Sequence, residues 1–345
     1  MIGTKPFFIA AGIIALLISV AVSAGLDKKD TADAFSFDDS PLKEPLEHPD
    51  WFKHSFLDLQ EDLDEALVAG KRGIIVYFGQ KRCAYCQMLM KVNFGREDIV
   101  AYTRRHFDVI PIDIWGVDEV TTLKDETLIE REYAIAEKTN FTPSLIFYDR
   151  NGRPALRLRG YYPPYKFRAA LEYVADGHYQ RESFADYLAR AEGAPKFEPG
   201  ELNEEPFFLP PPLDLDRSRI PGERPLVVFF EQGNCHACDV LHAGPLRQPA
   251  LAQLFTHFDN VQIDIASDLP VRTPVGVMTT AAEWARDLGL FYTPTLLFFD
   301  PHGQEIIRVD SVVGFYRLRN VLNYINSDGY QTEPDYQRWR ISHGF

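Results

Sequence analysis

The stretch IIVYFGQKRCAYCQML (74–89) recurs in altered form later in the chain, as LVVFFEQGNCHACDVL (226–241). Each version contains an apolar run, a polar loop, a C-x-x-C pair and further apolar residues at helical spacing. A short apolar run bounded by turn-forming residues is typical of a buried strand, and the periodicity after it is typical of a helix. Both stretches therefore predict a strand followed by a helix that begins at the cysteine pair.

A second pair of matching stretches lies downstream, where TNFTPSLIFYDRNGRP (139–154) corresponds to GLFYTPTLLFFDPHGQE (289–305). Three pairs of landmarks keep a near-constant offset of 151 or 152 positions: Cys83 and Cys235, Pro143 and Pro294, and Gly152 and Gly303. A constant offset of this kind indicates a duplicated domain.

Each copy predicts the same order of elements: strand, helix, strand, a partly helical insert, a strand after Thr-Pro, a tight turn into another strand, and a last helix. Strands that alternate with helices and end in a hairpin indicate a mixed central sheet with helices on both faces. We therefore predict an α/β chain of two tandem domains. The predicted strands are 74–78, 109–114 and 144–148 in the first copy and 227–230, 261–265 and 295–299 in the second, and the last helices are 165–176 and 316–327.

The two copies differ at their starts. Residues 55–72 predict an additional helix in the first copy, with Ser55 as N-cap and Gly70 at its end. Its apolar face is predicted to contain Phe56, Leu59, Leu63 and Leu67.

A proline-rich segment precedes the second copy, since residues 193–225 contain eight prolines. Such a composition predicts an extended, semi-rigid connector. Its apolar residues Phe207, Phe208 and Leu209 are expected to dock on a domain. The predicted organisation is a first domain over 50–192, a linker over 193–219 and a second domain over 220–345.

Residues 1–26 differ in composition from the rest of the chain. Lys5 is their only charged side chain, the apolar run over residues 6–26 follows it, and the small-residue sequence VSA ends at Ala24. These features are typical of a secretory signal, and about 20 apolar residues also suffice to span a bilayer. Cleavage after Ala24 and retention as a membrane anchor are both open, and both predict that the body of the protein is exported.

The bulk composition excludes some partners. The chain has 345 residues, 46% of them hydrophobic, and a formal net charge of −14 at pH 7. This length is sufficient for two ordinary domains. The negative charge argues against nucleic acid and anionic membrane surfaces as main partners.

All four cysteines lie in C-x-x-C pairs, Cys83 with Cys86 and Cys235 with Cys238. A structural staple is disfavoured, because so short a loop removes little chain entropy when it closes. A shared Cys₄ zinc site is disfavoured because each pair follows its own strand in its own domain. Haem attachment requires C-x-x-C-H, and neither pair is followed by histidine. We therefore predict two redox-active pairs and no metal.

A helix N-terminus stabilises negative charge, so a cysteine there has a lowered pKa and reacts as the thiolate. Cys83 and Cys235 are therefore the predicted nucleophiles, and Cys86 and Cys238 the predicted resolving thiols. Arg82, next to Cys83, and His236, inside the second pair, are candidates for tuning the thiolates, and a solvent-exposed position without such a role is the alternative for each.

The order of these elements resembles that of the thioredoxins. The resemblance implies that Thr142-Pro143 and Thr293-Pro294 are cis peptides facing the cysteine pairs, and that the backbone of each threonine binds an extended substrate. DIWG (113–116) and LRGYYPP (158–164) are most similar to the exported SoxW-type subgroup.

The sequence departs from the thioredoxin pattern at two positions of each copy, and the second departure puts a thioredoxin-like proton relay in doubt. The usual tryptophan before the first cysteine is replaced by Arg82 and Asn234, and the usual buried aspartate by Tyr77 and Phe229. Glu231 is a candidate substitute for that aspartate, but an exposed loop carboxylate is the expectation. His242, His257, His302 and His343 show no ligand spacing with carboxylates and are expected to be solvated or structural.

The SoxW-type resemblance implies a thiol reductase of the periplasm, or of the extracytoplasmic face of the cytoplasmic membrane. Its expected substrates are disulfide-containing exported proteins, and its expected electron donor is a membrane thiol reductant carrier. We expect no cofactor, since no nucleotide-binding glycine motif is present. The alternatives are one active domain with one inert docking or chaperone-like domain, and an oxidase or isomerase. A further hypothesis is that the two pairs have unequal potentials and exchange electrons.

Overall fold

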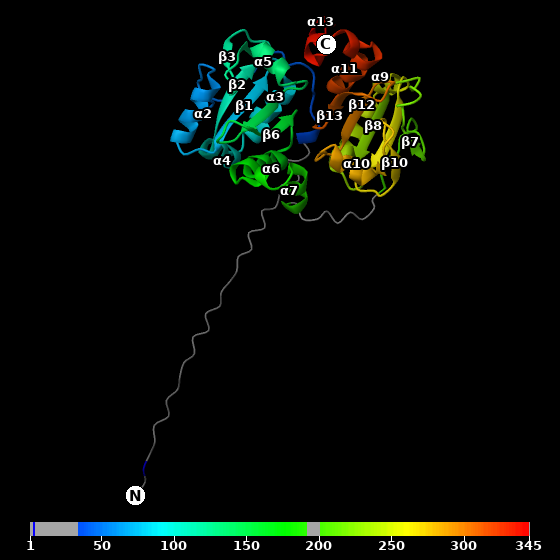
Figure 1. Ribbon diagram of the computed structural model, residues 1–345, viewed down its shortest axis with the longest axis horizontal. Helices are drawn as coiled ribbons and strands as arrows, with labels where there is room; N and C mark the ends of the chain where they lie inside the picture. Colours follow the sequence, from blue (N-terminus) through cyan, green and yellow to red (C-terminus); the bar gives the residue numbers. More distant parts are fainter. Residues whose placement is uncertain (1–2, 4–33, 192–200, 345) are drawn as a thin grey trace.

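The computed structural model describes residues 3, 34–191 and 201–344. Two α/β lobes lie side by side, the first coloured blue to green and the second yellow to red in Figure 1. The predicted signal or anchor over residues 1–26 lies outside the described residues, apart from Gly3. Within the described residues, no helix has both the length and the apolar character needed to cross a membrane.

Each lobe is built on a four-stranded mixed sheet. The first has the order β2-β1-β5-β6 and the second β9-β8-β12-β13. In each sheet the strand before the cysteine pair is parallel to the next strand and antiparallel to the strand after Thr-Pro. These strands are β1 (Gly73–Gly79), β2 (Phe107–Asp113), β5 (Ser144–Tyr148) and β6 (Pro154–Arg159), and β8 (Leu226–Glu231), β9 (Asp259–Asp264), β12 (Thr295–Phe299) and β13 (Glu305–Val309).

Helices cover both faces of each sheet, and the predicted fold class is confirmed. The helices of the first domain are α2 (Leu59–Val68), α3 (Ala84–Met88), α4 (Glu97–His106), α5 (Glu130–Ala136), α6 (Pro164–Ala175) and α7 (Phe184–Ala191). Those of the second are α8 (His236–Ala243), α9 (Pro249–Phe255), α10 (Ala281–Asp287), α11 (Phe315–Asn326), α12 (Gly329–Thr332) and α13 (Tyr336–Ser342). Short helical turns span Leu89–Asn93, His178–Gln180 and Pro245–Arg247.

The predicted insert contains a short hairpin before its helix in both domains. In the first domain β3 (Glu119–Thr121) pairs with β4 (Thr127–Ile129). In the second domain β10 (Pro270–Arg272) pairs with β11 (Met278–Thr280) and also with β7 (Leu213–Asp214). Strand β7 comes from the predicted linker, so part of that segment joins the second domain.

Strand alternation divides the first core into two layers. Ile75 and Tyr77 of β1 face the side covered by α3, α4 and α6, whereas Val76 and Phe78 face the side covered by α2 and α5. The second domain repeats this division, and the α8, α9 and α11 layer of its sheet contains Phe229. Cys83 and Cys86 belong to the layer of the first domain that contains α6.

The additional helix of the first domain is shorter than predicted. It begins at Leu59, and its N-cap is Asp58, whose carboxylate accepts hydrogen bonds from the backbone N–H groups of Gln60 and Glu61. Ser55 therefore is not the cap; its hydroxyl donates to Asp62 instead. Phe56 is 98% exposed, so its predicted place on the apolar face was wrong because it precedes the helix.

The predicted docking of the connector is confirmed in part. The rings of Phe207 and Phe208 pack on the second core, with ring centroids 5.3 Å apart for Phe207 and Phe255 and 5.1 Å for Phe208 and Phe229. Leu209 is 48% exposed, so its side chain does not dock as predicted. The residue contacts the second domain through its backbone N–H, which donates to the carbonyl of Asn260.

The two domains contact each other through equivalent surfaces. Phe141 of the first domain packs in the core of the second, and Tyr292, at the equivalent position of the repeat, packs in the core of the first. The backbone N–H of Val312 donates to the carbonyl of Tyr161, its own equivalent. Contacts between equivalent residues are the signature of a two-fold interface. The repeats therefore pack as a pseudo-symmetric pair.

Candidate redox sites

The first cysteine of each pair is the N-cap of a helix. Cys83 precedes α3, and its Sγ accepts a hydrogen bond from the backbone N–H of Cys86 at 2.9 Å. Cys235 precedes α8, and its Sγ accepts from the N–H of Cys238 at 3.1 Å. Both pairs are closed as disulfides. The sulfur of Cys83 or Cys235 thus occupies the position at which backbone N–H groups stabilise a thiolate.

Each cysteine faces a Thr-Pro peptide of its own domain. The Thr142-Pro143 and Thr293-Pro294 bonds are cis, as the sequence predicted. The hydroxyl of Thr142 lies 3.3 Å from the sulfur of Cys83, and that of Thr293 lies 3.6 Å from the sulfur of Cys235. The structure therefore brings the predicted cysteines, threonines and prolines together twice, in the same arrangement.

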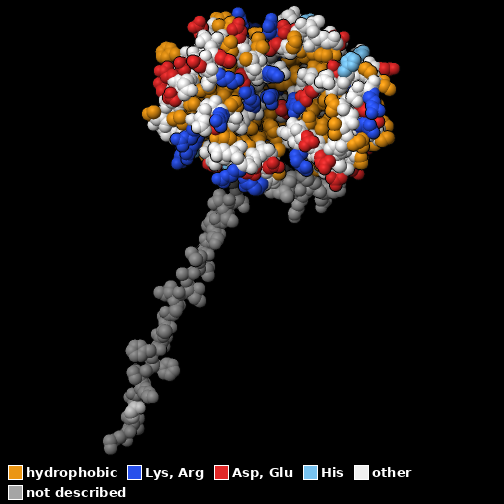
Figure 2. All heavy atoms as spheres, viewed as in Figure 1, with side chains coloured by type: hydrophobic (Ala, Val, Ile, Leu, Met, Phe, Trp, Pro, Cys, Tyr) orange, Lys and Arg blue, Asp and Glu red, His pale blue; other side chains and the backbone are white. Residues whose placement is uncertain are grey.

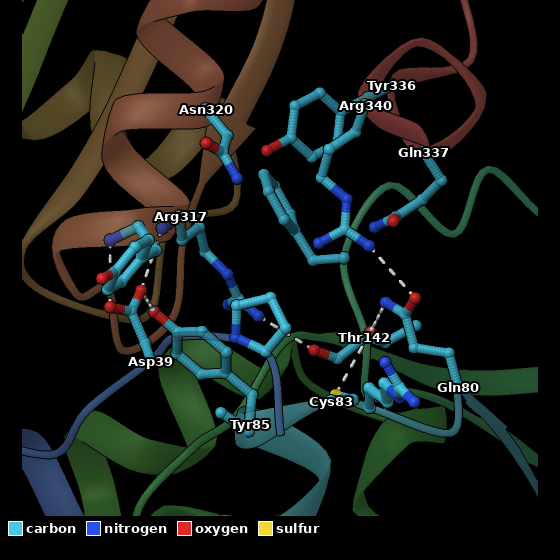
Figure 3. A pocket seen from close by; sticks show the side chains of 15 residues that line it. Asp39, Gln80, Cys83, Tyr85, Thr142, Arg317, Asn320, Tyr336, Gln337 and Arg340 are labelled. Atoms are coloured by element: carbon cyan, nitrogen blue, oxygen red, sulfur yellow. Dashed lines mark hydrogen bonds between the residues drawn. The ribbon is translucent and has the colours of Figure 1, made fainter. Parts of the chain in front are cut away.

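Both sites lie against the domain interface. Cys83 and Cys235 are each only 6% exposed. A small pocket beside Cys83 is lined by the first domain, by α11 and α13 of the second domain, and by Asp39 from the N-terminal segment (Figure 3). That segment, dark blue in Figure 1, passes between the lobes. The other domain therefore covers the first site.

Asp39 links the N-terminal segment to both domains. Its carboxylate accepts hydrogen bonds from the backbone N–H groups of Tyr316 and Arg317 at the start of α11, both at 2.9 Å. It also accepts from the hydroxyl of Tyr85, which lies inside the first cysteine pair, at 2.8 Å. Tyr85 Oη in turn accepts from the N–H of Gly314. Asp39 thus fixes the N-terminus of α11 against the first redox site.

Two arginines of the second domain reach into the first site (Figure 3). Arg317 donates to the backbone carbonyl of Thr142 at 2.9 Å, and its guanidinium lies 3.3 Å from the centroid of the Tyr85 ring. Arg340 donates to Oε1 of Gln80 at 3.1 Å. Gln80 then donates to the hydroxyl of Thr142 at 2.7 Å. Lys and Arg side chains also gather near the middle of the face shown in Figure 2, where the lobes meet.

The second site is covered by aromatic residues of the first domain and the N-terminal segment. The ring of His236 lies 5.5 Å from that of Phe35. Tyr162 stacks on Phe291 at 5.6 Å and meets Tyr292, next to Thr293, edge-on. The cover of this site is therefore mainly apolar, whereas that of the first site is cationic.

A family comparison decides the identity of the fold. The model of the thioredoxin-like domain matches residues 59–175 and again residues 212–326. The chain belongs to the thioredoxin-like domain family. None of the curated proteins matches it.

Solved structures of thioredoxin-like proteins are similar only at low identity. A thioredoxin-fold protein from Helicobacter pylori is 24% identical, with 34% of this chain and 78% of that chain covered and a TM-score of 0.30. A thioredoxin from Thermus thermophilus is 20% identical, with coverage of 43% and 96% and a TM-score of 0.28. A disulphide isomerase from Xylella fastidiosa is 19% identical, with coverage of 43% and 100% and a TM-score of 0.24. The function of this chain must therefore be inferred from its own residues.

Neither domain of this chain has the buried aspartate that is usual in thioredoxins. Tyr77 is fully buried, and burial raises its pKa far above the ordinary value. Its hydroxyl has no hydrogen-bond partner among the residues that the structure describes. Phe229 occupies the equivalent position of the second domain. Neither side chain can accept a proton from a resolving thiol near neutral pH.

Glu231 is buried, so the expectation of an exposed loop carboxylate was wrong. It ends β8, two residues after Phe229, and strand alternation therefore directs it to the face covered by α8. Its carboxylate lies 3.0 Å from Nε2 of His242 and accepts from Gln262 at 2.7 Å. Nδ1 of His242 lies 3.0 Å from Oε1 of Glu205. His242 is thus a buried structural histidine, one of the two alternatives expected for it, and its partner Glu205 comes from the distant connector.

The environment of His242 favours its charged form. Burial alone would lower the pKa of the imidazole, but hydrogen bonds and charges from Glu231 and Glu205 outweigh burial and raise it. His242 lies four residues after Cys238 on α8, so both side chains are on the same face of the helix. A buried cluster of one imidazole and two carboxyl groups therefore lies one turn from the second resolving thiol. Gly79 and Met90 stand at the positions of the first domain that are equivalent to Glu231 and His242.

The proposed tuning residues differ in their surroundings. Arg82 is exposed and lines the pocket beside Cys83. His236 is also exposed, and its ring contacts Phe35. Their effect on the thiolates stays a prediction. Across residues 34–191 and 201–344, no group of His, Cys, Asp and Glu is arranged to hold a metal ion.

Proposed function

We propose that this protein is an exported thiol–disulfide oxidoreductase that reduces disulfides of exported proteins, of the SoxW type. The observation that carries the proposal is the duplicated site, in which a helix-capping cysteine of a C-x-x-C pair faces a cis Thr-Pro peptide. Structural disulfides need neither feature, whereas dithiol exchange uses both. A membrane thiol carrier supplies the electrons at the extracytoplasmic face.

The reaction proceeds by two exchanges at each pair. The thiolate of Cys83 attacks one sulfur of the substrate disulfide, and the other substrate sulfur leaves as a thiolate and takes a proton. Cys86 then loses its proton and attacks the sulfur of Cys83, which releases the second substrate thiol. Two electrons pass to the substrate, and the Cys83–Cys86 disulfide forms. A donor dithiol reverses these steps and becomes a disulfide itself.

Access to the first site requires movement of the second domain. An extended substrate would bond to the backbone of Thr142, but the carbonyl of Thr142 already accepts from Arg317. The described arrangement is therefore the closed form, and protein substrates enter after the interface separates.

Single-site variants test this function. In a reductase assay with a protein disulfide and dithiothreitol as donor, Cys83→Ser and Cys235→Ser should each lower the rate, and the double variant should have none above background. A rate that only one variant lowers would favour the alternative of one active domain and one inert docking domain. Full activity in the double variant would refute the proposal.

Both sites lie against the domain interface, which motivates the hypothesis of an internal exchange of electrons. If the pairs exchange, Cys83 and Cys235 form an inter-domain mixed disulfide during turnover. The Cys86→Ala/Cys238→Ala protein should trap this bond, detectable as a linked peptide pair by mass spectrometry. Failure to trap it under oxidation would mean that the two pairs act separately.

A further inference from the structure

We propose that the second domain completes the first redox site: Arg317 and Arg340 stabilise the thiolate that Cys83 carries when its pair is reduced. This inference rests on the proposed function and concerns how the first site is tuned. The two arginines are positioning residues contributed by the other repeat, and sequence comparison of the C-x-x-C stretches alone would not find them.

The first observation is that two cations line this pocket and that neither is hydrogen-bonded to a carboxylate of the described residues. Arg317 is 7% exposed, and Nε of Arg340 is buried with no hydrogen-bond partner within the described chain. Among the described residues, the acceptors of the two guanidiniums are hydroxyl, carbonyl and amide oxygens, and none is a carboxylate. Burying an unpaired charge is costly. The fold retains two such charges at one place, which points to an anion that forms there.

The second observation is that both guanidiniums belong to the pocket of Cys83. A chain of hydrogen bonds leads from Arg340 to the sulfur of Cys83. Arg340 donates to Gln80, Gln80 donates to Thr142 Oγ1, and this oxygen lies beside Cys83 Sγ. Arg317 holds the carbonyl of the same threonine. Figure 3 shows both side chains directed toward the Thr142–Cys83 contact. The pocket of about 50 Å³ has room for little besides a few water molecules.

The other charged groups of the pocket do not supply this anion. Asp39 lines the pocket, but its oxygens are already held by the backbone N–H groups of Tyr316 and Arg317 and by the hydroxyl of Tyr85. The pocket's tyrosines stay protonated, since burial raises the pKa of both Tyr85 and Tyr336. Arg82 adds a further cation. On reduction, the sulfur of Cys83 is the group of this pocket that can become an additional anion.

The arrangement is only partly repeated at the second site, which has one cation in place of two at the equivalent positions. Lys166 stands at the position equivalent to Arg317, and its Nζ donates to the carbonyl of Phe291. Ala189 stands at the position equivalent to Arg340. The cations therefore stabilise the reduced form of the first pair more than that of the second. A stabilised reduced form makes a pair more oxidising, so electrons pass preferentially from the second pair to the first.

The test measures the alkylation of Cys83 against pH in the reduced full-length protein, with iodoacetamide and peptide mass spectrometry. In Arg317→Gln and in Arg340→Gln, the pKa of Cys83 should rise by at least about half a unit, roughly a threefold fall in thiolate near neutral pH. Arg340→Lys should restore most of it. Arg338→Gln, an exposed change on α13, is the matched control, and Cys235 in the same samples is the internal control.

The competing outcomes are distinct. An unchanged pH profile of Cys83 alkylation in Arg340→Gln would overturn the inference, and so would an equal shift in the profile of Cys235. Arg340→Gln provides this test even if Arg317→Gln fails to fold. The equilibrium of the first pair with glutathione should also move about three- to tenfold toward the disulfide in the glutamine variants. If Cys83 is not reduced at all in the wild-type protein, the proposed function fails at this site instead.

Discussion

The buried cluster of Glu231, His242 and Glu205 permits a sharp test by the substitution His242→Leu. Both ring nitrogens of His242 face carboxylate oxygens at 3.0 Å, and ionised carboxylates only accept hydrogen bonds. This arrangement favours a ring that donates from both nitrogens, in agreement with the raised pKa of the imidazole. The substitution leaves Glu231, 1% exposed, without this cation, and leaves Glu205, 5% exposed, with the exposed Arg247 at 4.0 Å.

The expected loss of stability is large. Removing one partner of a buried ion pair typically costs about 3–5 kcal/mol, because the remaining charge is desolvated and unpaired. The effect should depend on pH. Since the folded-state pKa of His242 is raised above its ordinary value of 6.5, its contribution is fully present below that value. The contribution is lost as the pH rises through the raised pKa.

Urea unfolding of the oxidised protein, followed by circular dichroism between about pH 6 and pH 9, measures both effects. The difference between wild type and His242→Leu should be largest near pH 6 and should shrink as the pH rises. His257→Leu, at an exposed histidine, is the control and should change little. A His242→Leu protein as stable as wild type at pH 6 would show that the ring is neutral and that its charged pairing is wrong.

Three further substitutions test the interface and the sites. A side chain at Gly160, whose φ is +103°, would collide with Ser311 of the second domain, so Gly160→Val should separate the domains and increase the radius of gyration; an unchanged scattering profile would contradict the described interface. Asp39→Ala should cost about 1–2 kcal/mol, as for loss of a helix cap, and should increase proteolysis of the N-terminal segment; unaltered stability and cleavage would show that the segment is not held by α11. Thr142→Val removes the hydroxyl that lies 3.3 Å from the sulfur of Cys83 and can donate to its thiolate, so it should slow disulfide exchange at Cys83 and leave Cys235 unaffected, as measured by stopped-flow exchange; equal slowing at both sites would indicate a global defect.

Much of each domain could be predicted because its signals are local. The apolar run before Cys83, the Thr-Pro step and the Asp-x-x-Gly turns recur at a fixed offset, and the structure has strands and turns at these places. The N-cap of α2 was misassigned because serine and aspartate are both favoured at that position. Which of Ser55 and Asp58 is the cap depends on where the backbone becomes helical, and that is at Leu59.

The residues that complete the sites were missed because they come from distant segments. No local motif predicts the contacts of Arg317 and Arg340. The available signal is Arg317 itself, a charged residue on the buried face of α11. Glu231 could have been recognised, since it continues the inward alternation of Val227 and Phe229. Its partner Glu205 could not, because the connector composition does not specify where it docks.

Both cysteine pairs are expected to be working redox couples. A redox titration in glutathione or dithiothreitol buffers, with each pair read separately by alkylation and peptide mass spectrometry, tests this expectation most directly. Both pairs should titrate reversibly in the native protein, the second in the range of about −270 to −220 mV expected of a reductase and the first at a more oxidising value. A pair that cannot be reduced without unfolding would be structural, and two such pairs would contradict the account.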